Sequence, residues 1–421
     1  MDSRISETAY QEALEWLYSQ LPMFSRIGAA AYKPGLQTTE KLDSLFGHPH
    51  KKFKAIHVGG TNGKGSTSHM IASVLHAAGF KTALYTSPHL TDFRERMRIN
   101  GKMIPEEKVT EFVEKWQKSG FEGKPSFFEL TMIMAFNWFA EENVDFAVIE
   151  VGMGGRLDST NIITPLLSVI TNISHDHNQF LGETLEEIAS EKAGIIKKDV
   201  PVVIGEWQPE TEKIFIEKAR KEGSEIEFAD RTEAFSGMNI KLPLQGDYQQ
   251  KNLKTVLTAL KRLNQIGVVI SEEAIKEGIE NVVKQTGLMG RWMVVEEKPL
   301  TIADTGHNIA GIEYNVTQLL RLLQQNPGAK LRFVIGFVAD KAIDKILKLL
   351  PVDAEYYVTN AQIPRALPAS KLFEQMESKG FKGRKFENVA EAYEAAKREA
   401  SAQDIIFVGG STFVVADFLA I

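Results

Sequence analysis

Short apolar runs rich in Val and Ile alternate with segments of helical period along most of this 421-residue chain, and this alternation limits the fold more than any other feature. The first five runs are each followed by polar or glycine-rich residues, and they lie at residues 53–58, 81–85, 146–151, 167–171 and 200–204. Strands that alternate with helices are typical of a mostly parallel sheet with crossover helices. The sequence therefore predicts an α/β fold.

A second alternation begins near Trp292 and predicts a second, smaller α/β domain of Rossmann-like type. Its apolar runs lie at residues 300–303, 331–336, 355–358 and 405–408. One hydrophobic core usually stops growing at roughly 250–300 residues, so two domains are expected on length alone. We place the boundary near residue 290, because the linking region ends in the glycines Gly287 and Gly290. The predicted domains are residues 1–290 and 291–421.

The composition excludes several classes of function. The chain has no cysteine, so disulfides, thiolate nucleophiles and cysteine-ligated metals are excluded. Its formal net charge of −6 gives no general electrostatic reason to bind nucleic acid or an anionic membrane. No apolar run approaches the roughly 20 residues needed to span a bilayer, and the first residues lack the pattern of a signal peptide. We expect a cytoplasmic protein, monomeric by default, that acts on small molecules.

The first predicted strand runs through a glycine-rich turn into a helical segment. The turn comprises Gly60, Thr61, Asn62, Gly63, Lys64, Gly65 and Ser66. Glycines let consecutive backbone N–H groups face one anion, and the helix N-terminus adds partial positive charge, so Lys64 would reach the β- and γ-phosphates of a nucleotide. The strict P-loop pattern is not met, since Val58 holds the first glycine position and Gly65 replaces Ser or Thr. A tight connection without a ligand is the alternative.

Polar residues directly after the predicted strands form a second candidate site. Ser87, Glu150 and His177 each follow or close one of these strands. In open α/β sheets, ligands collect beyond the carboxyl ends of the strands. A hydroxyl, a carboxylate and an imidazole could hold Mg²⁺ on a triphosphate, although Mg²⁺ prefers oxygen ligands. His175 competes with His177 for this role, and loop residues without a ligand are the alternative for all of them.

Five segments in fixed order carry a resemblance to a known family. They read GTNGKGS at residues 60–66, YTSPHL at 85–90, ERMRING at 95–101, EVGMGGRLD at 150–158 and EKAGI at 191–195. Together they resemble the folylpolyglutamate synthase and dihydrofolate synthase family of the Mur ligase superfamily, over nearly the whole chain. The resemblance implies a ligase that uses ATP and Mg²⁺ to join L-glutamate to a reduced folate or to dihydropteroate. It also implies an ATP- and pterin-binding P-loop-type domain followed by a glutamate-binding domain.

The resemblance assigns roles to residues of the first domain. The glycine-rich turn holds ATP, and Ser87, Glu150 and His177 ligate magnesium. Lys192 matches a lysine that is often carbamylated in the family, with an ordinary helix lysine as the alternative. Asn252 matches the position that contacts adenine, although a helix cap is the competing explanation.

Further roles concern the pterin and the second domain. Phe128 and Asp158 match pteroate-binding positions, and we prefer Phe128 to Phe127 because one of the two should lie in the core. Three residues match positions that meet the nucleotide and the reaction centre, and these are Arg291, Asp304 and His307. Thr305 departs from the family pattern, which has glycine there. Ser411 matches a position that binds the incoming glutamate, with a plain helix N-cap as the alternative.

The chemistry implied is ATP-driven amide formation through an acyl phosphate, in which Lys64, Lys192, Arg291 and His307 are the candidate catalytic residues. The nearest rival is a Mur-type ligase of peptidoglycan precursors, which would carry a whole domain before the turn where this sequence has 58 residues before Gly59. A non-ligase nucleotide-binding protein is the rival from another class. A dehydrogenase is disfavoured because Gly-x-Gly-x-x-Gly is not satisfied. The sequence does not decide between dihydropteroate and folate, or whether both are used.

Overall fold

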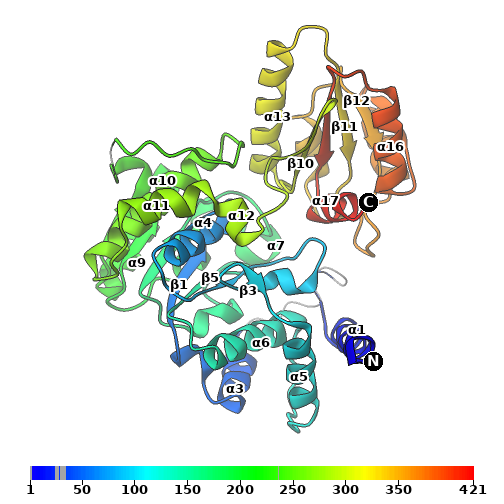
Figure 1. Ribbon diagram of the computed structural model, residues 1–421. Coiled ribbons are helices and arrows are strands. Elements are labelled where there is room, and N and C mark those ends of the chain that lie inside the picture. Colours follow the sequence, from blue (N-terminus) through cyan, green and yellow to red (C-terminus); the bar gives the residue numbers. More distant parts are fainter. Residues whose placement is uncertain (1, 24–27, 29–34, 236) are drawn as a thin grey trace. The chain divides into compact units, whose positions relative to one another are not determined.

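The computed structural model describes residues 2–23, 28, 35–235 and 237–421 (Figure 1). The chain divides into two compact units. The N-terminal unit comprises Met1–Pro243 and Lys251–Gly287, and the C-terminal unit comprises Leu244–Gln250 and Leu288–Ile421. Residues 244–250 therefore pack with the second unit, although the predicted boundary places them in the first domain.

The N-terminal unit contains an eight-stranded sheet in the order β4-β3-β2-β5-β1-β6-β7-β8. The strands are β1 Lys54–Gly59, β2 Thr82–Tyr85, β3 Met97–Ile99, β4 Lys102–Met103, β5 Phe146–Glu150, β6 Leu167–Ile170, β7 Val202–Ile204 and β8 Ile226–Phe228. All neighbours pair in parallel except β2 with β3 and β3 with β4. The predicted mostly parallel sheet is confirmed, and the sequence missed the short strands β3, β4 and β8.

The central strands of this sheet are buried because helices cover both of its faces. Alternate residues of a strand face opposite sides, so Ala147 and Ile149 of β5 join the core cluster of Phe136 while Val148 faces away from it. The helices are α1 Asp2–Gln20, α3 Gln37–Leu45, α4 Lys64–Ala77, α5 Glu106–Gln117, α6 Phe127–Glu141, α7 Asn178–Leu181, α8 Leu185–Ala193, α9 Pro209–Glu222, α10 Gln249–Gln265, α11 Glu272–Glu280 and α12 Val282–Thr286. Short 3₁₀ turns accompany them in the part of the unit that the structure describes, among them η2 Pro49–Lys51, η3 Phe93–Arg96, η4 Ser159–Ile162 and η5 Ala229–Arg231.

The C-terminal unit contains a six-stranded sheet in the order β13-β12-β11-β14-β10-β9. The strands are β9 Met293–Glu297, β10 Leu300–Asp304, β11 Leu331–Ile335, β12 Glu355–Val358, β13 Lys382–Lys385 and β14 Ile405–Gly409. Only β9 with β10 is antiparallel among the pairs. The predicted α/β character of this part is confirmed.

Two hydrophobic clusters lie on opposite faces of the second sheet, one with α13 Ile309–Gln325, α14 Ile343–Leu347 and α15 Ala369–Glu377, the other with α16 Val389–Glu399 and α17 Thr412–Leu419. Figure 1 shows α13 and α16 on either side of β11 and β12. In the part of the chain that the structure describes, none of the helices has the length and apolar character needed to cross a membrane.

Candidate functional site

The glycine-rich turn connects β1 directly to α4 and is held in place by residues that follow β6. The backbone N–H of Thr61 donates to the carbonyl of Asn172 (2.9 Å), and the N–H of Asn62 donates to the Asn172 side chain (2.9 Å). Gly60 has a φ of 131° and passes against Thr171, so closely that a Cβ atom would collide with the threonine side chain. Only glycine fits there, because both the conformation and the space exclude a side chain.

The helix that follows the turn begins where the predicted phosphate site needs it. Gly63 is the N-cap of α4 with a φ of 83°, and Lys64 is the first helical residue. Gly65 and Ser66 form the first turn of α4 and are buried. The N–H groups of this first turn have no partner within the helix, which is the arrangement that binds phosphate.

Two lysines converge on the carbonyl oxygen of Gly60. The ammonium of Lys64 donates to this oxygen (3.2 Å) and to that of Thr61 (3.1 Å). Lys192, near the end of α8, donates to the same oxygen (2.8 Å) and is only 4% exposed. Burial, with the positive charge of Lys64 as a second cause, lowers the pKa of Lys192 to about 7. The amine of Lys192 is therefore substantially uncharged near neutral pH.

The predicted metal ligands lie at strand ends, and two of them are in direct contact. Glu150 is the last residue of β5 and is buried, while Ser87 follows β2, the neighbouring strand. The backbone N–H of Ser87 donates to Oε2 of Glu150 (3.1 Å), so the two residues lie next to each other at the edge of the sheet where the strands end. Serine hydroxyl and carboxylate oxygens suit a Mg²⁺-type cation.

The third predicted ligand, His177, follows β6 and adopts a left-handed conformation with a φ of 52°. Its backbone N–H donates to Oδ1 of Asp176 (2.9 Å), which fixes the turn into α7. The competing His175 contacts Asn178 through Nδ1 (3.3 Å). The unusual backbone of His177 marks it as the more constrained of the two histidines, and its role as a ligand stays a prediction.

Phe128 and Asp158 both lie close to Gly152. A Cβ atom on Gly152 would come within 2.5 Å of Cζ of Phe128 and 3.1 Å of Oδ2 of Asp158, so glycine permits this close approach. The Phe128 ring is half-buried, whereas Phe127 is 2% exposed and stacks on Tyr18 with ring centroids 5.7 Å apart. The burial pattern makes Phe127 the core residue and leaves Phe128 partly exposed.

The Asp158 carboxylate is held by a network that sequence reasoning missed. Oδ1 accepts from the hydroxyl of Thr160 (2.5 Å) and Oδ2 accepts from the N–H of Met153 (2.8 Å), while burial raises the pKa of Asp158. Nε2 of His57 lies 2.8 Å from the same Thr160 hydroxyl. Because that hydroxyl donates to Asp158, we assign Nε2 of His57 as the donor to its oxygen. The available signal was a histidine inside the otherwise apolar strand β1.

Burial lowers the pKa of His57 to about 3, so this residue is uncharged at neutral pH. It therefore acts on Asp158 only through the hydrogen-bond chain that passes through Thr160. That chain orients the carboxylate without neutralising its charge.

Asn252 lies against the start of α4. Its side-chain oxygen occupies the space that a Cβ atom on Gly63 would need, and the residue is 6% exposed. Asn252 is the fourth residue of α10, which begins at Gln249. Asn252 is therefore not a helix cap. Its side-chain amide instead packs beside the glycine-rich turn.

In the C-terminal unit, Asp304 ends β10 and is 3% exposed. Its carboxylate accepts four hydrogen bonds, from the hydroxyl of Tyr248 (2.6 Å), the backbone N–H groups of Trp292 (2.7 Å) and Gly306 (2.7 Å), and the side chain of Asn315 (2.8 Å). A carboxylate offers about four acceptor positions. This arrangement favours a positioning role for Asp304 over direct contact with a nucleotide.

Thr305, where the family pattern has glycine, anchors Arg291. The guanidinium of Arg291 donates to the hydroxyl of Thr305 and to the carbonyl of Gly290 (3.1 Å). Nδ1 of His307 donates to the carbonyl of Thr305 (3.0 Å), which leaves Nε2 as an acceptor. Threonine in place of glycine thus adds a contact. The backbone of Thr305 does not have a positive φ, so its conformation does not require glycine.

Ser411 is the N-cap of α17, and its side-chain oxygen accepts from the N–H of Phe413 (3.2 Å). The capping role that was the alternative is therefore present. Binding of glutamate by the same hydroxyl stays a prediction.

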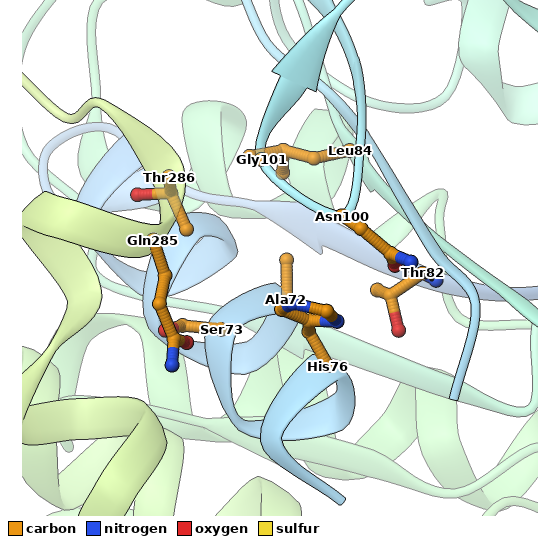
Figure 2. Close-up of a pocket in the computed structure, with 9 residues that line it drawn as sticks. All are labelled: Ala72, Ser73, His76, Thr82, Leu84, Asn100, Gly101, Gln285 and Thr286. Atoms are coloured by element: carbon orange, nitrogen blue, oxygen red, sulfur yellow. Dashed lines mark hydrogen bonds between the residues drawn. The ribbon is translucent and has the colours of Figure 1, made fainter. Parts of the chain in front are cut away.

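A pocket elsewhere in the N-terminal unit is not the candidate site. Figure 2 shows side chains from α4 and α12 around it, including Ser73, His76 and Gln285. Ser73 donates within it to Gln285 (2.6 Å), and the remaining space suits about one water molecule. None of the predicted site residues lines this pocket.

Comparison with known proteins identifies the family. The Mur ligase middle domain matches residues 58–260, and the Mur ligase, glutamate ligase domain matches residues 290–412. The dihydrofolate synthase/folylpolyglutamate synthase of Bacillus subtilis (strain 168) is 33% identical, over 97% of this chain and 98% of that protein. The chain belongs to the folylpolyglutamate synthase/dihydrofolate synthase family of Mur ligases.

Solved structures of the same family agree in fold. The structure of E. coli FolC in complex with DHPP and ADP has a TM-score of 0.85 at 31% identity, covering 98% of this chain and 97% of that one. A bifunctional folylpolyglutamate synthase/dihydrofolate synthase from Yersinia pestis, complexed with AMPPNP and Mn ion, has a TM-score of 0.82 at 29% identity and covers 98% and 97%. The predicted family, fold class and ATP-dependent ligase activity are confirmed by these relatives.

The contact between Gly63 and Asn252 can be tested with a matched pair of variants. Gly63→Ala and Gly79→Ala both place alanine at a positive φ, 83° and 88° respectively, and each should cost about 1–2 kcal/mol of stability. Only the Gly63 variant meets a neighbour, since nothing lies within 4 Å of a Cβ at Gly79.

We expect Gly63→Ala to weaken binding of an ATP analogue at least about tenfold, which corresponds to roughly 1.4 kcal/mol, as measured by calorimetry. Gly79→Ala should bind normally. Equal affinities in the two folded variants would contradict the assigned role of the turn.

Proposed function

We propose that this ligase joins the amine of L-glutamate to the carboxylate of a pterin-containing substrate, a reduced folate or dihydropteroate, with ATP as the energy source. The observation that carries the proposal is the phosphate turn with Lys64 and Lys192 directed at one carbonyl oxygen. The relatives support it, since E. coli FolC binds ADP together with DHPP. The predicted use of ATP and a divalent metal agrees with the ADP, AMPPNP and Mn in the two solved relatives.

The reaction has two steps. A carboxylate oxygen of the pterin substrate attacks the γ-phosphorus of ATP, and ADP leaves with the electron pair of the broken bond. The amine of glutamate then attacks the acyl carbon, loses a proton, and expels phosphate to leave the amide. The protein contributes mainly by positioning the groups and offsetting negative charge. The N–H groups at the start of α4 and the ammonium of Lys64 supply these contacts to the phosphates.

The residues at the sheet edge fit a divalent cation. Ser87 and Glu150, which are joined by a hydrogen bond from the Ser87 backbone, carry the oxygen ligands, and His177 supplies an imidazole after β6. A cation held there would neutralise phosphate charge when the nucleotide is bound. The choice of His177 over His175 is part of this proposal.

Lys192 is proposed to be carbamylated. Its nitrogen must be uncharged to attack CO₂, and the lowered pKa of about 7 provides that form near neutral pH. The step forms an N–C bond and releases one proton. The resulting carbamate is negative and lies beside the ammonium of Lys64, which stabilises it by charge attraction.

The dependence on pH follows from the sign of this shift. The uncharged fraction of Lys192 increases as the pH rises through about 7, so less CO₂ is needed at pH 8 than at pH 6. We expect activity in CO₂-depleted buffer to recover when bicarbonate is added, and at equal dissolved CO₂ the recovery should be larger at pH 8. The measurement is initial rate against bicarbonate, together with a ¹³C signal from labelled CO₂.

The ¹³C carbamate signal should disappear in Lys192→Met. A variant that keeps the signal, or a wild-type rate that ignores bicarbonate at both pH values, would show that Lys192 stays unmodified.

The pterin is proposed to contact Phe128 and Asp158. The partly exposed ring of Phe128 can stack on a pterin ring. Asp158, whose oxygens already accept from Thr160 and Met153, is the candidate acceptor for the amino and ring N–H groups of the pterin. We place L-glutamate on the C-terminal unit, where Ser411 and His307 are the candidate contacts, and the roles of Arg291 and Asp304 toward the nucleotide also remain proposals.

Neighbouring phenylalanines provide an internal control for the pterin site. Phe128→Leu should raise KM for the pterin substrate at least about fivefold, in the range of a lost aromatic contact, while KM for ATP stays the same. Phe127→Leu should instead lower stability by about 1–2 kcal/mol, because the residue is 2% exposed in the core. Steady-state kinetics and thermal unfolding measure the two effects. The reverse pattern would place the pterin against Phe127.

The substrate itself is tested by ADP release. We expect ADP formation with ATP, L-glutamate and either dihydropteroate or tetrahydrofolate, and a product heavier by one glutamyl residue in mass spectrometry. Omitting glutamate should remove the product. If neither pterin stimulates ADP release, the proposed substrate class is wrong, even if the nucleotide binds.

A further inference from the structure

Three potential metal ligands lie together at the end of α3, and none of them is among the residues assigned above. Nδ1 of His48 is 2.7 Å from Oδ2 of Asp43, and Nδ1 of His50 is 2.6 Å from Oδ1 of the same carboxylate. One ligand atom from each residue lies within 4.8 Å of the others. They form the only group of three or more His, Asp or Glu side chains with this spacing among the residues that the structure describes.

The backbone holds this cluster in a fixed turn. The N–H of His48 donates to the carbonyl of Asp43 (2.8 Å), and the N–H of Lys51 donates to the carbonyl of His48 (3.1 Å). Gly47 and His48 both have positive φ, 75° and 55°, and Pro49 restricts the link between the two histidines. A turn fixed in this way brings the ligands together before any ion binds, which lowers the ordering cost of binding.

Burial and charge suit a cation that is open to solvent on one side. The Asp43 side chain is 3% exposed, that of His50 is 14% exposed and that of His48 is 47% exposed. Burial alone would raise the pKa of Asp43, but the hydrogen bonds from His50 and His48 outweigh it and lower the pKa. The carboxylate is therefore ionised at neutral pH, and the exposed His48 lies on the side from which an ion can enter.

We propose that Asp43, His48 and His50 form a binding site for a borderline divalent cation, Zn²⁺ in the first instance. One oxygen of Asp43 and one nitrogen from each imidazole are the protein ligands, and water completes the coordination. Two imidazoles and a carboxylate suit Zn²⁺ far better than Mg²⁺, which prefers oxygen. The site is distinct from the predicted magnesium ligands Ser87, Glu150 and His177.

Binding requires a small rearrangement that the cluster permits. Zn²⁺ bonds of roughly 2.0–2.1 Å in tetrahedral geometry separate neighbouring ligand atoms by about 3.3 Å. The present N–O distances of 2.6 and 2.7 Å are shorter because protons bridge the atoms. Each ring must move its proton from Nδ1 to Nε2, which frees the Nδ1 lone pair for the ion. The His48 side chain is 47% exposed, which leaves it room to accommodate the change.

A bound ion would join the end of α3 to η2, directly before β1. The strand β1 leads into the phosphate turn, so the ion stabilises the segment on which the turn is built. The competing explanation is that the carboxylate ties α3 to η2 by hydrogen bonds alone and binds no metal.

The test uses Co²⁺ as a spectroscopic probe on the full-length protein, in the Glu150→Ala background to remove the predicted magnesium site. We expect one equivalent of Co²⁺ with visible d–d absorption of tetrahedral type, displaced by Zn²⁺ and not by Mg²⁺. Zn²⁺ should also raise the unfolding temperature of this protein relative to its state in EDTA.

Variants of the ligands separate the two explanations. His48→Ala and His50→Ala should bind Co²⁺ at least about tenfold more weakly and lose the absorption, whereas His76→Ala, a histidine outside the cluster, should keep both. His48 is exposed enough for its variant to fold, which circular dichroism checks. No d–d absorption in the Glu150→Ala protein, or an unchanged spectrum in folded His48→Ala, would overturn the proposal.

Discussion

The pair of hydrogen bonds that the carbonyl oxygen of Gly60 accepts from two lysines is the interaction on which the N-terminal site depends. It draws Lys64 from the start of α4 and Lys192 from α8 to one oxygen atom, although two ammonium groups repel each other at such range. The repulsion is relieved in one of two ways, by loss of the Lys192 proton or by a negative group placed between the lysines. A site that is strained until an anion arrives is suited to hold a phosphate and, on Lys192, a carbamate. The close contact of Gly60 with Thr171 fixes the position of the carbonyl oxygen that both lysines reach.

Much of the architecture could be predicted because it depends on local pattern. The strands β1, β5, β6 and β14 are buried along nearly their whole length and mostly apolar, and such runs are visible in the sequence. The strand β13 was missed because its four residues, KGRK, are all exposed, so no apolar signal marks it. The edge strand β8 was also missed, and its residues are only partly buried. Hydrophobic pattern reports burial, and edge strands have little of it.

The candidate site was predictable where motifs carry it and not where distant residues meet. The sequence predicted that the glycine-rich turn, Ser87 and Glu150 lie at or after the ends of strands, and they do. The chain from His57 through Thr160 to Asp158 was not, because His57 and Thr160 are 103 residues apart and meet only when β1 is assembled. The hydrogen bond between Thr305 and Arg291 was not predicted, since it depends on side-chain directions that sequence does not report. Asp304 matched a motif, but its four hydrogen bonds are a property of the folded unit.

One detail of the division into units limits how the molecule can be taken apart. Residues 244–250 belong to the C-terminal unit, yet they come before the last segment of the N-terminal unit. Tyr248, which completes the hydrogen bonds of Asp304, is therefore supplied from a different stretch of chain than the rest of that sheet. A fragment that starts at residue 288 would contain every strand of the second sheet and still leave a buried carboxylate with an unfilled acceptor position. The second unit is contiguous in space but not in sequence, so no single cut yields it whole.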